Sequence, residues 1–199
     1  MTDLFREPDD ATRLDPALRN DLLQTWITNR SELNDAEQEN ILKGSAWARR
    51  IRRGTNPANV LTDQFVRALH KQMFGEVWRW AGSFRQSDLN IGVAPHLINH
   101  EMAQLLDTVR YWVAHRTFSA DEIAVRLHHG LTRVHGFPNG NGRHAREMAD
   151  LLIERLDGEA FTWGSGSLQN TGDLRNSYVS ALKTADNHDI QPLINFVRS

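Results

Sequence analysis

The sequence predicts an all-α protein that forms one domain of 199 residues, with a single short extended interruption. Apolar residues recur every three or four positions through most of the chain, and this is the spacing of one helix face. Helix-start signals precede two of these stripes, with Thr62 before one and Ser119 with Glu122 before the other. A chain of this length can bury one sizeable core without dividing into separate domains.

The stripes place the helices along the chain in order. The first stripe combines leucines with Trp26 and Ile27, the fifth is closed by Gly158, and the sixth contains Tyr178. The helices are expected at residues 18–27, 62–73, 102–113, 123–134, 148–156, 174–182 and 190–197.

One interval, residues 83–95 (SFRQSDLNIGVAP), breaks the helical pattern. It contains two short extended runs on either side of Asp88 to Asn90. Such runs around polar turn residues indicate a small β-hairpin or an extended flap.

Composition excludes several classes of protein. The net charge of −2 provides no global field for nucleic acid, and no direct nucleic-acid binding is expected. The absence of cysteine excludes disulfides and thiolate chemistry. The start of the chain lacks a signal-peptide pattern, and no stretch approaches the roughly 20 apolar residues of a membrane span. We therefore expect a cytoplasmic protein that does not bind membranes.

The stretch with the clearest chemistry is residues 135–146, which read HGFPNGNGRHAR. It lies between two predicted helices, and its glycines allow backbone N–H groups to approach an anion closely. The following helix start, with Arg143 and Arg146 on it, favours phosphate. His135, at the other end of the loop, is suited to act as a general base, and Phe137 can anchor the loop in the core.

A plain surface turn between two helices is the competing interpretation, because Asn-Gly pairs are common in turns. A turn alone does not require a histidine, a buried aromatic residue and two spaced arginines around it. The combination therefore favours a phosphate-binding catalytic loop.

These residues resemble the signature of the Fic family (Fic/Doc fold), His-x-Phe-x-acidic-Gly-Asn-Gly-Arg-x-x-Arg. Seven of the eight fixed positions agree, and Asn139 is the departure. Trp80-Ala81-Gly82 followed by Arg85 resembles the segment that leads into the family's flap. Tyr178 and the residues after it resemble the family's C-terminal helical pattern. The local variant of the signature resembles the branch called mobile mystery protein B.

The resemblance implies a Fic-type helical bundle that transfers AMP from ATP to a Ser, Thr or Tyr hydroxyl of a target protein. His135 would deprotonate the hydroxyl, and Arg146 would hold the γ-phosphate. Asn139 stands where the family places the acidic ligand of Mg²⁺, and it keeps only a neutral oxygen ligand. The phosphates would be held by the backbone amides of Gly140 and Gly142 together with Asn141 and Arg143.

The flap would present the target by pairing with its backbone, as in strand addition. Its docking residues would be Arg85, Gln86, Ser87, Asp88, Leu89, Asn90 and Ile91. The expected organisation is a single Fic domain over residues 1–199. Within it, residues 18–53 form N-terminal inhibitory and scaffold helices, and residues 60–199 form the catalytic core.

The inhibitory helix of many Fic proteins carries Ser/Thr-x-x-x-Glu-Gly-Asn, and residues 28–34 (TNRSELN) resemble it. Thr28, Glu32 and Asn34 match. By analogy Glu32 would pair with Arg146 and displace the γ-phosphate. The alternative is that Thr28 or Ser31 caps a helix and Glu32 is solvated, and Glu39-Asn40 is a second, poorer match.

Three functions remain open on the sequence. The first is AMP transfer that is autoinhibited in the unbound state. The second is Doc-like transfer of another phosphate-containing group. The third is a non-catalytic nucleotide-binding member of a toxin–antitoxin-like pair, with a helix-turn-helix partner of the mobile mystery protein A type.

Overall fold

The computed structural model of the chain describes residues 20–50, 56–166, 168 and 172–199. The described residues contain seven α-helices, and their 3₁₀ turns include η2 (Pro57–Val60), η3 (Pro95–Leu97) and η4 (Trp163–Ser165). The helices are α1 (Arg30–Arg50), α2 (Asp63–Phe74), α3 (Ile98–His115), α4 (Ala120–Val134), α5 (Asn141–Arg155), α6 (Asp173–Asp186) and α7 (Gln191–Val197).

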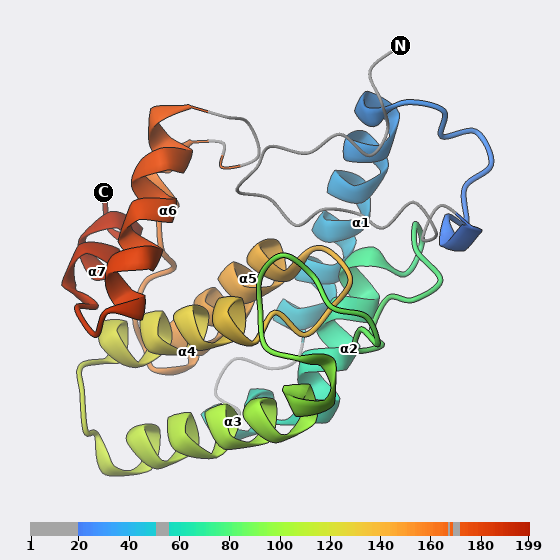
Figure 1. Ribbon diagram of the computed structural model, residues 1–199. Helices are drawn as coiled ribbons and strands as arrows, with labels where there is room; N and C mark the ends of the chain where they lie inside the picture. The colour runs from blue at the N-terminus through green and yellow to red at the C-terminus, as the bar shows by residue number, and fades with distance from the viewer. Residues whose placement is uncertain (1–19, 51–55, 167, 169–171) are drawn as a thin grey trace.

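Helices α4 and α5 pack against each other at the centre of the bundle. Figure 1 shows α1 and α2 on one side of this pair and α6 and α7 on the other. Helix α3 packs along α4, and α1 packs along α2. The largest fully buried side chains include Trp78, Phe74 and Phe137, so the core extends beneath the loop between α4 and α5.

The expected start signals act as helix caps. The Thr62 hydroxyl accepts a hydrogen bond from the Phe65 N–H at 3.1 Å and begins α2. The Ser119 hydroxyl accepts one from the Glu122 N–H at 3.2 Å and begins α4. Five of the predicted helices therefore correspond to α2 to α6, and α7 matches the prediction for residues 190–197.

The helix predicted over residues 18–27 is wrong for its described part. Residues 20–29 contain only a short 3₁₀ turn, turns and a β-bridge between Leu22 and Trp78. The Leu23 N–H donates to the Val77 carbonyl, and the Arg79 N–H donates to the Asp21 carbonyl, each at 2.9 Å. These non-local bonds satisfy the backbone that a local helix would have paired.

The β-hairpin predicted within residues 83–95 does not form, and the part of this segment before η3 is an irregular loop. The backbone N–H groups near its two ends bond to the last residue of α4 and to the loop that follows it. The Arg85 N–H donates to the Gly136 carbonyl at 2.9 Å, and the Val93 N–H donates to the Val134 carbonyl at 3.4 Å. We refer to residues 83–94 as the flap.

Helices α1 and α2 approach unusually closely at Gly44. A Cβ atom on Gly44 would lie 2.7 Å from the backbone of Met73. Near this contact, the Asn40 side chain donates to the Gln72 carbonyl at 2.9 Å and accepts from the Glu76 N–H at 2.8 Å. The register of α1 on α2 is thus fixed by a backbone contact and two side-chain hydrogen bonds.

In the part of the chain that the structure describes, no helix has the length and apolar character to cross a membrane.

Candidate active site

The loop between α4 and α5, residues 135–140, lies on α2. Gly140 is the N-cap of α5 and has a left-handed conformation with φ 77°. A Cβ atom at this position would lie 2.5 Å from the Phe74 ring, so only glycine fits both the backbone and the packing. Helix α2 therefore forms the support on which the predicted phosphate-binding loop rests.

The Asn141 side chain closes this loop from within. Its Oδ1 accepts from the Phe137 N–H at 2.9 Å, and its Nδ2 donates to the Phe137 carbonyl at 2.7 Å. The Phe137 ring is itself buried. The side chain of Asn141 is thus used in shaping the loop, and only its backbone amide can serve a phosphate.

The start of α5 is the predicted anion-binding end of the loop. Gly140 supplies no side-chain cap, and the first helical bond into its carbonyl comes from the His144 N–H at 2.9 Å. The amides of residues 141–143 therefore belong to the first turn, which has no acceptors within the helix. The Gly140 N–H differs, because it donates to the side-chain oxygen of Asn139 at 2.6 Å.

The two arginines of the motif have different surroundings. Arg143 forms an ion pair of 2.6 Å with Glu37 of α1, and its guanidinium lies 5.0 Å from the centre of the Phe74 ring. Glu37 is only 1% exposed. Arg146 lies beside the start of α5, with its guanidinium 5.8 Å from the Tyr178 ring centre. Arg146 is accordingly the arginine of the pair that stands without an acidic partner among the described residues.

His135 ends α4 in a left-handed conformation with φ 53° and is 5% exposed. Its Nδ1 lies 3.2 Å from the Thr132 carbonyl, so the tautomer that satisfies this contact carries hydrogen on Nδ1 and the lone pair on Nε2. The pKa of His135 is lowered to about 4, mainly by burial and also by the nearby Arg85 charge, while the Thr132 hydrogen bond opposes both. The imidazole is therefore a neutral base at pH 7.

Arg85 holds the flap over His135. Its Nε donates to the His135 carbonyl at 2.7 Å, and its two other nitrogens donate to the carbonyls of Ser87 and Val93. A Cβ atom on Gly92 would lie 2.5 Å from the Cβ of His135, so the flap touches the candidate base directly.

The predicted docking residues of the flap divide into two groups. Arg85 is 3% exposed and fully used inside the molecule, so the prediction that it faces a target is wrong. Leu89 is half-buried. The side chains that face solvent are Gln86, Ser87, Asp88, Asn90 and Ile91.

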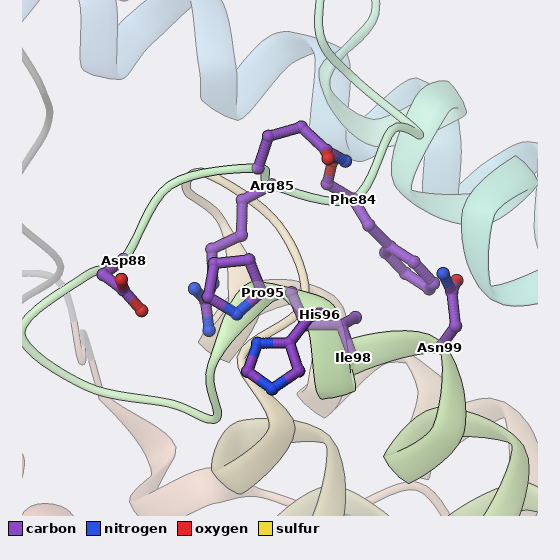
Figure 2. A pocket seen from close by; sticks show the side chains of 8 residues that line it. Phe84, Arg85, Asp88, Pro95, His96, Ile98 and Asn99 are labelled. Atoms are coloured by element: carbon purple, nitrogen blue, oxygen red, sulfur yellow. The ribbon is translucent and has the colours of Figure 1, made fainter.

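A pocket of about 420 Å³ lies between the flap and the start of α3, as Figure 2 shows. Phe84, Pro95 and Ile98 provide its apolar lining, while Asp88 and His96 are among its polar residues. The flap thus borders an open cavity next to the segment that is expected to meet a protein target.

The expected contact between Glu32 and Arg146 does not form in this structure. The Glu32 carboxylate accepts from the Thr28 N–H at 2.6 Å and from the Thr28 hydroxyl at 3.1 Å, and the Thr28 backbone bond is the main reason that its pKa is lowered. This is the capping role at the start of α1, where Asn34 also lies. The α1 carboxylate that reaches the loop is Glu37, and its partner is Arg143.

Two residues of the site were missed from the sequence. Glu37 and Arg143 are separated by 106 positions, and no short motif signals such a pair. His70 of α2 contacts the Asn139 carbonyl, 69 positions away. Both residues sit in ordinary helical patterns, and only the packing of α1 and α2 brings them to the loop.

The residues at the loop make an incomplete Mg²⁺ site on their own. Within the described residues, no three His, Asp or Glu side chains are grouped to hold a metal ion. Asn139 offers one neutral oxygen, which the Gly140 N–H already engages. His128 and His129 point to separate partners, because His128 bonds to the Tyr178 hydroxyl at 2.9 Å and His129 to Asp186 at 2.7 Å.

Comparison with known proteins gives a consistent picture. Residues 60–153 match the family model described as "Fic/DOC family". "Protein adenylyltransferase Fic" of Drosophila yakuba is 26% identical over 141 residues, which are 69% of this chain and 27% of that protein. "Protein adenylyltransferase fic-1" of Caenorhabditis elegans is 29% identical over 120 residues, which are 59% of this chain and 22% of that protein. This chain therefore spans about a quarter of the length of the curated relatives that it matches.

Solved structures share the fold at low identity. The Bartonella tribocorum BepC protein with bound AMPPNP has a TM-score of 0.67 at 17% identity and covers 92% of this chain and 97% of its own. Fic-1 (residues 134–508) of C. elegans has a TM-score of 0.61 at 21% identity, covering 81% of this chain and 47% of its own. These likenesses show the arrangement of the helices.

Proposed function

The chain belongs to the Fic/DOC family through residues 60–153, and from this premise we propose that it is a protein adenylyltransferase. It would transfer AMP from ATP to a Ser, Thr or Tyr hydroxyl of a target protein. The observation that carries the proposal is the placement of a buried neutral imidazole, His135, at one end of a loop whose other end is the uncapped start of α5. The names of the curated relatives support the same activity.

In the proposed reaction, Nε2 of His135 takes the proton of the target hydroxyl. The hydroxyl oxygen forms a bond to the α-phosphorus of ATP. The bond between the α-phosphorus and the oxygen that bridges to the β-phosphorus breaks, so that pyrophosphate leaves. The amides of residues 141–143 and the positive end of the α5 dipole would hold the phosphates. Arg146 would neutralise the γ-phosphate.

Arg143 has a structural role in this proposal rather than the phosphate contact that the motif implies. Its ion pair with Glu37 and its position over Phe74 support this assignment. The side chain of Asn141 likewise shapes the loop. Phosphate binding would then rest on backbone amides and one arginine.

Mg²⁺ enters the proposal as an ion that arrives on the ATP phosphates, where it neutralises their charge. The side-chain oxygen of Asn139 is the protein ligand on offer. The phosphates would have to supply most of the remaining ligands, because the chain has no acidic cluster at the loop among its described residues.

The proposal for target binding rests on the exposed part of the flap. Residues 86–91 have an irregular backbone whose ends are fixed by Arg85, and an extended target segment could pair with this backbone. Such pairing selects for extended conformation more than for particular side chains. The pocket beside Phe84 and His96 would accept a side chain of the same segment.

The activity is tested with α-labelled and γ-labelled ATP, Mg²⁺ and cell lysate. We expect label from the α position on protein, loss of this label when EDTA removes Mg²⁺, and a decrease of about 10²–10⁴-fold in the His135→Ala variant. Label from the γ position would instead indicate a Doc-like phosphotransferase. No label with retained ATP binding would favour the non-catalytic nucleotide-binding alternative, to which the neutral Asn139 gives specific support.

We also propose that α1 restrains the activity of the catalytic core. The support for this is the contact of α1 with the loop through Glu37 and the likeness of residues 28–34 to the inhibitory pattern. Because Glu32 bonds to Thr28 here, the proposed pairing with Arg146, which would displace the γ-phosphate, requires Glu32 to leave Thr28.

The restraint is tested by the Glu32→Gly variant in the same α-label assay. We expect increased labelling of targets and of the protein itself. Asn29→Ala is the matched control, because it removes the side-chain hydrogen bond to the Glu32 N–H at the same helix start and leaves the carboxylate. Equal or lower labelling in Glu32→Gly, or an equal increase in Asn29→Ala, would contradict restraint by Glu32.

A further inference from the structure

We propose that His70 is a positioning residue that ties the nucleotide loop (residues 135–140) to the root of the flap (residues 82–85). This inference deepens the proposed function, on which it rests for its link to catalysis. The two segments that His70 joins are the proposed ATP-binding and target-binding parts of the site. They are separated by about fifty residues in the sequence, and one imidazole of α2 contacts both.

The hydrogen bonds of His70 fix its chemical form. The Gly82 N–H donates to Nδ1 at 3.1 Å, so Nδ1 must carry a lone pair. Nε2 lies 3.0 Å from the Asn139 carbonyl, which can only accept, so Nε2 must carry the hydrogen. A neutral ring of this one tautomer satisfies both segments, and a positively charged or inverted ring would lose the bond to Gly82.

Packing holds the ring in this orientation. His70 is completely buried, and its ring stacks on Phe137 with 3.7 Å between the ring centres. The Phe74 ring, one turn further along α2, lies 4.7 Å from the His70 ring between ring centres. Burial also keeps the pKa of His70 well below its ordinary value, which agrees with the neutral form.

The positions of the two partners explain why the contact matters. Asn139 immediately precedes Gly140, whose left-handed backbone starts α5 and its phosphate-facing amides. Gly82 has φ 82° and ends the turn that leads into Arg85, the residue that fixes the flap over His135. A shift of the ring would therefore move both the phosphate-binding turn and the flap.

The two halves of the contact can be removed separately. In His70→Asn, the side-chain oxygen can replace Nδ1 as acceptor for Gly82, and the bond to Asn139 is lost. In His70→Gln, the longer amide can replace Nε2 as donor to Asn139, and the bond to Gly82 is lost. His129→Gln is the matched control, since His129 of α4 bonds to the Asp186 carboxylate and not to either segment.

The experiment combines hydrogen exchange with steady-state kinetics. We expect His70→Asn to speed amide exchange at residues 139–142 and to raise the KM for ATP roughly 2- to 10-fold, the range of one hydrogen bond. His70→Gln should speed exchange at residues 82–86 and raise the KM for the protein target by a similar factor. His129→Gln should leave both segments and both constants as in the wild type.

Uniform faster exchange in all three variants, with both constants changed alike, would reduce His70 to a packing residue and overturn the proposal. A measurement on the unaltered protein is independent of variant folding: ¹⁵N NMR of His70 at pH 7 should report hydrogen on Nε2 alone, and any other form would overturn it. If the wild type transfers no AMP, the proposed function fails, while the exchange pattern and the tautomer still decide whether His70 couples the two segments.

Discussion

His135, the proposed general base, combines near-complete burial with a hydrogen bond that fixes its tautomer. Burial disfavours the charged imidazolium, and the nearby guanidinium of Arg85 disfavours it further. The base is therefore available over a wider range of acidic pH than an exposed histidine would be.

The pH dependence of kcat/KM follows from this shift. The pKa of His135 is lowered from 6.5 to about 4, so the active neutral form persists as pH falls through 6.5 and is lost only near pH 4. We expect a flat acid side down to about pH 5, measured with α-labelled ATP while circular dichroism verifies folding. A fall of kcat/KM in acid with an apparent pKa near 6.5 would contradict the burial of His135.

At the residue scale, the sequence predicts local geometry and misses long-range partners. The spacing within residues 135–146 correctly indicates a loop with its histidine at one end and Gly140 before a helix. It does not reveal that Arg143 forms an ion pair with Glu37, because that pair depends on how α1 packs. The sequence also does not reveal that the Arg85 side chain is buried. Its burial depends on carbonyls that the loop and the flap contribute.

At the scale of elements, α1 is joined to α5 through a buried ion pair. The Glu37 carboxylate accepts from both Arg143 at 2.6 Å and the Trp78 indole N–H at 2.7 Å. Removing one partner of a buried pair leaves the other charge uncompensated, which typically costs about 3–5 kcal/mol.

The Glu37→Gln variant measures this connection. The amide keeps the shape and an acceptor oxygen, so we expect destabilisation at the lower end of that range, about 3 kcal/mol in urea unfolding. Glu39→Gln is the matched control on the same helix, because the Glu39 side chain is 72% exposed and pairs with Lys43 near the surface. A similar, small effect in both variants would show that the Glu37 pair contributes little.

The elements also show where pattern reading succeeds. The stripes of α2 to α6 coincide with helices because spacing and burial agree there, and side-chain caps add to this at the starts of α2 and α4. Residues 20–29 have a similar leucine-rich pattern, but pairing with residues 77–79 satisfies their backbone instead. The flap failed as a hairpin because Arg85 binds carbonyls of the flap itself and the flap ends bind the neighbouring loop. No local pattern signals either competition.

For the whole molecule, the core contains an unusual number of neutral histidines. Burial lowers the pKa of His128 to about 3 and of His135 and His144 to about 4, and that of His70 falls well below its ordinary value. Asp150 acts in the opposite direction, because burial raises its pKa to about 6. Four histidines with a lowered pKa therefore act against one carboxyl with a raised pKa in the dependence of stability on pH.

Stability should therefore fall in mild acid. The unfolded histidines bind protons near pH 6.5. In the folded state His128, His135 and His144 do so only near pH 4 or below, and the pKa of His70 is also lowered, so the unfolded state binds more protons in between. Each histidine then removes up to roughly 1.4 kcal/mol per pH unit, and Asp150 returns part of this below pH 6. We expect the urea midpoint to fall steadily from pH 7 to pH 5, and a constant midpoint would contradict neutral burial of these rings.

The contact at Gly44 limits how the N-terminal helix can move. With the Met73 backbone 2.7 Å from where a Cβ atom would be, only a residue without a side chain fits at that crossing. Sliding α1 by one turn would bring Asn40 or Ala48 into a space that admits neither. Any regulation through this helix would therefore separate α1 from α2 rather than slide it along α2.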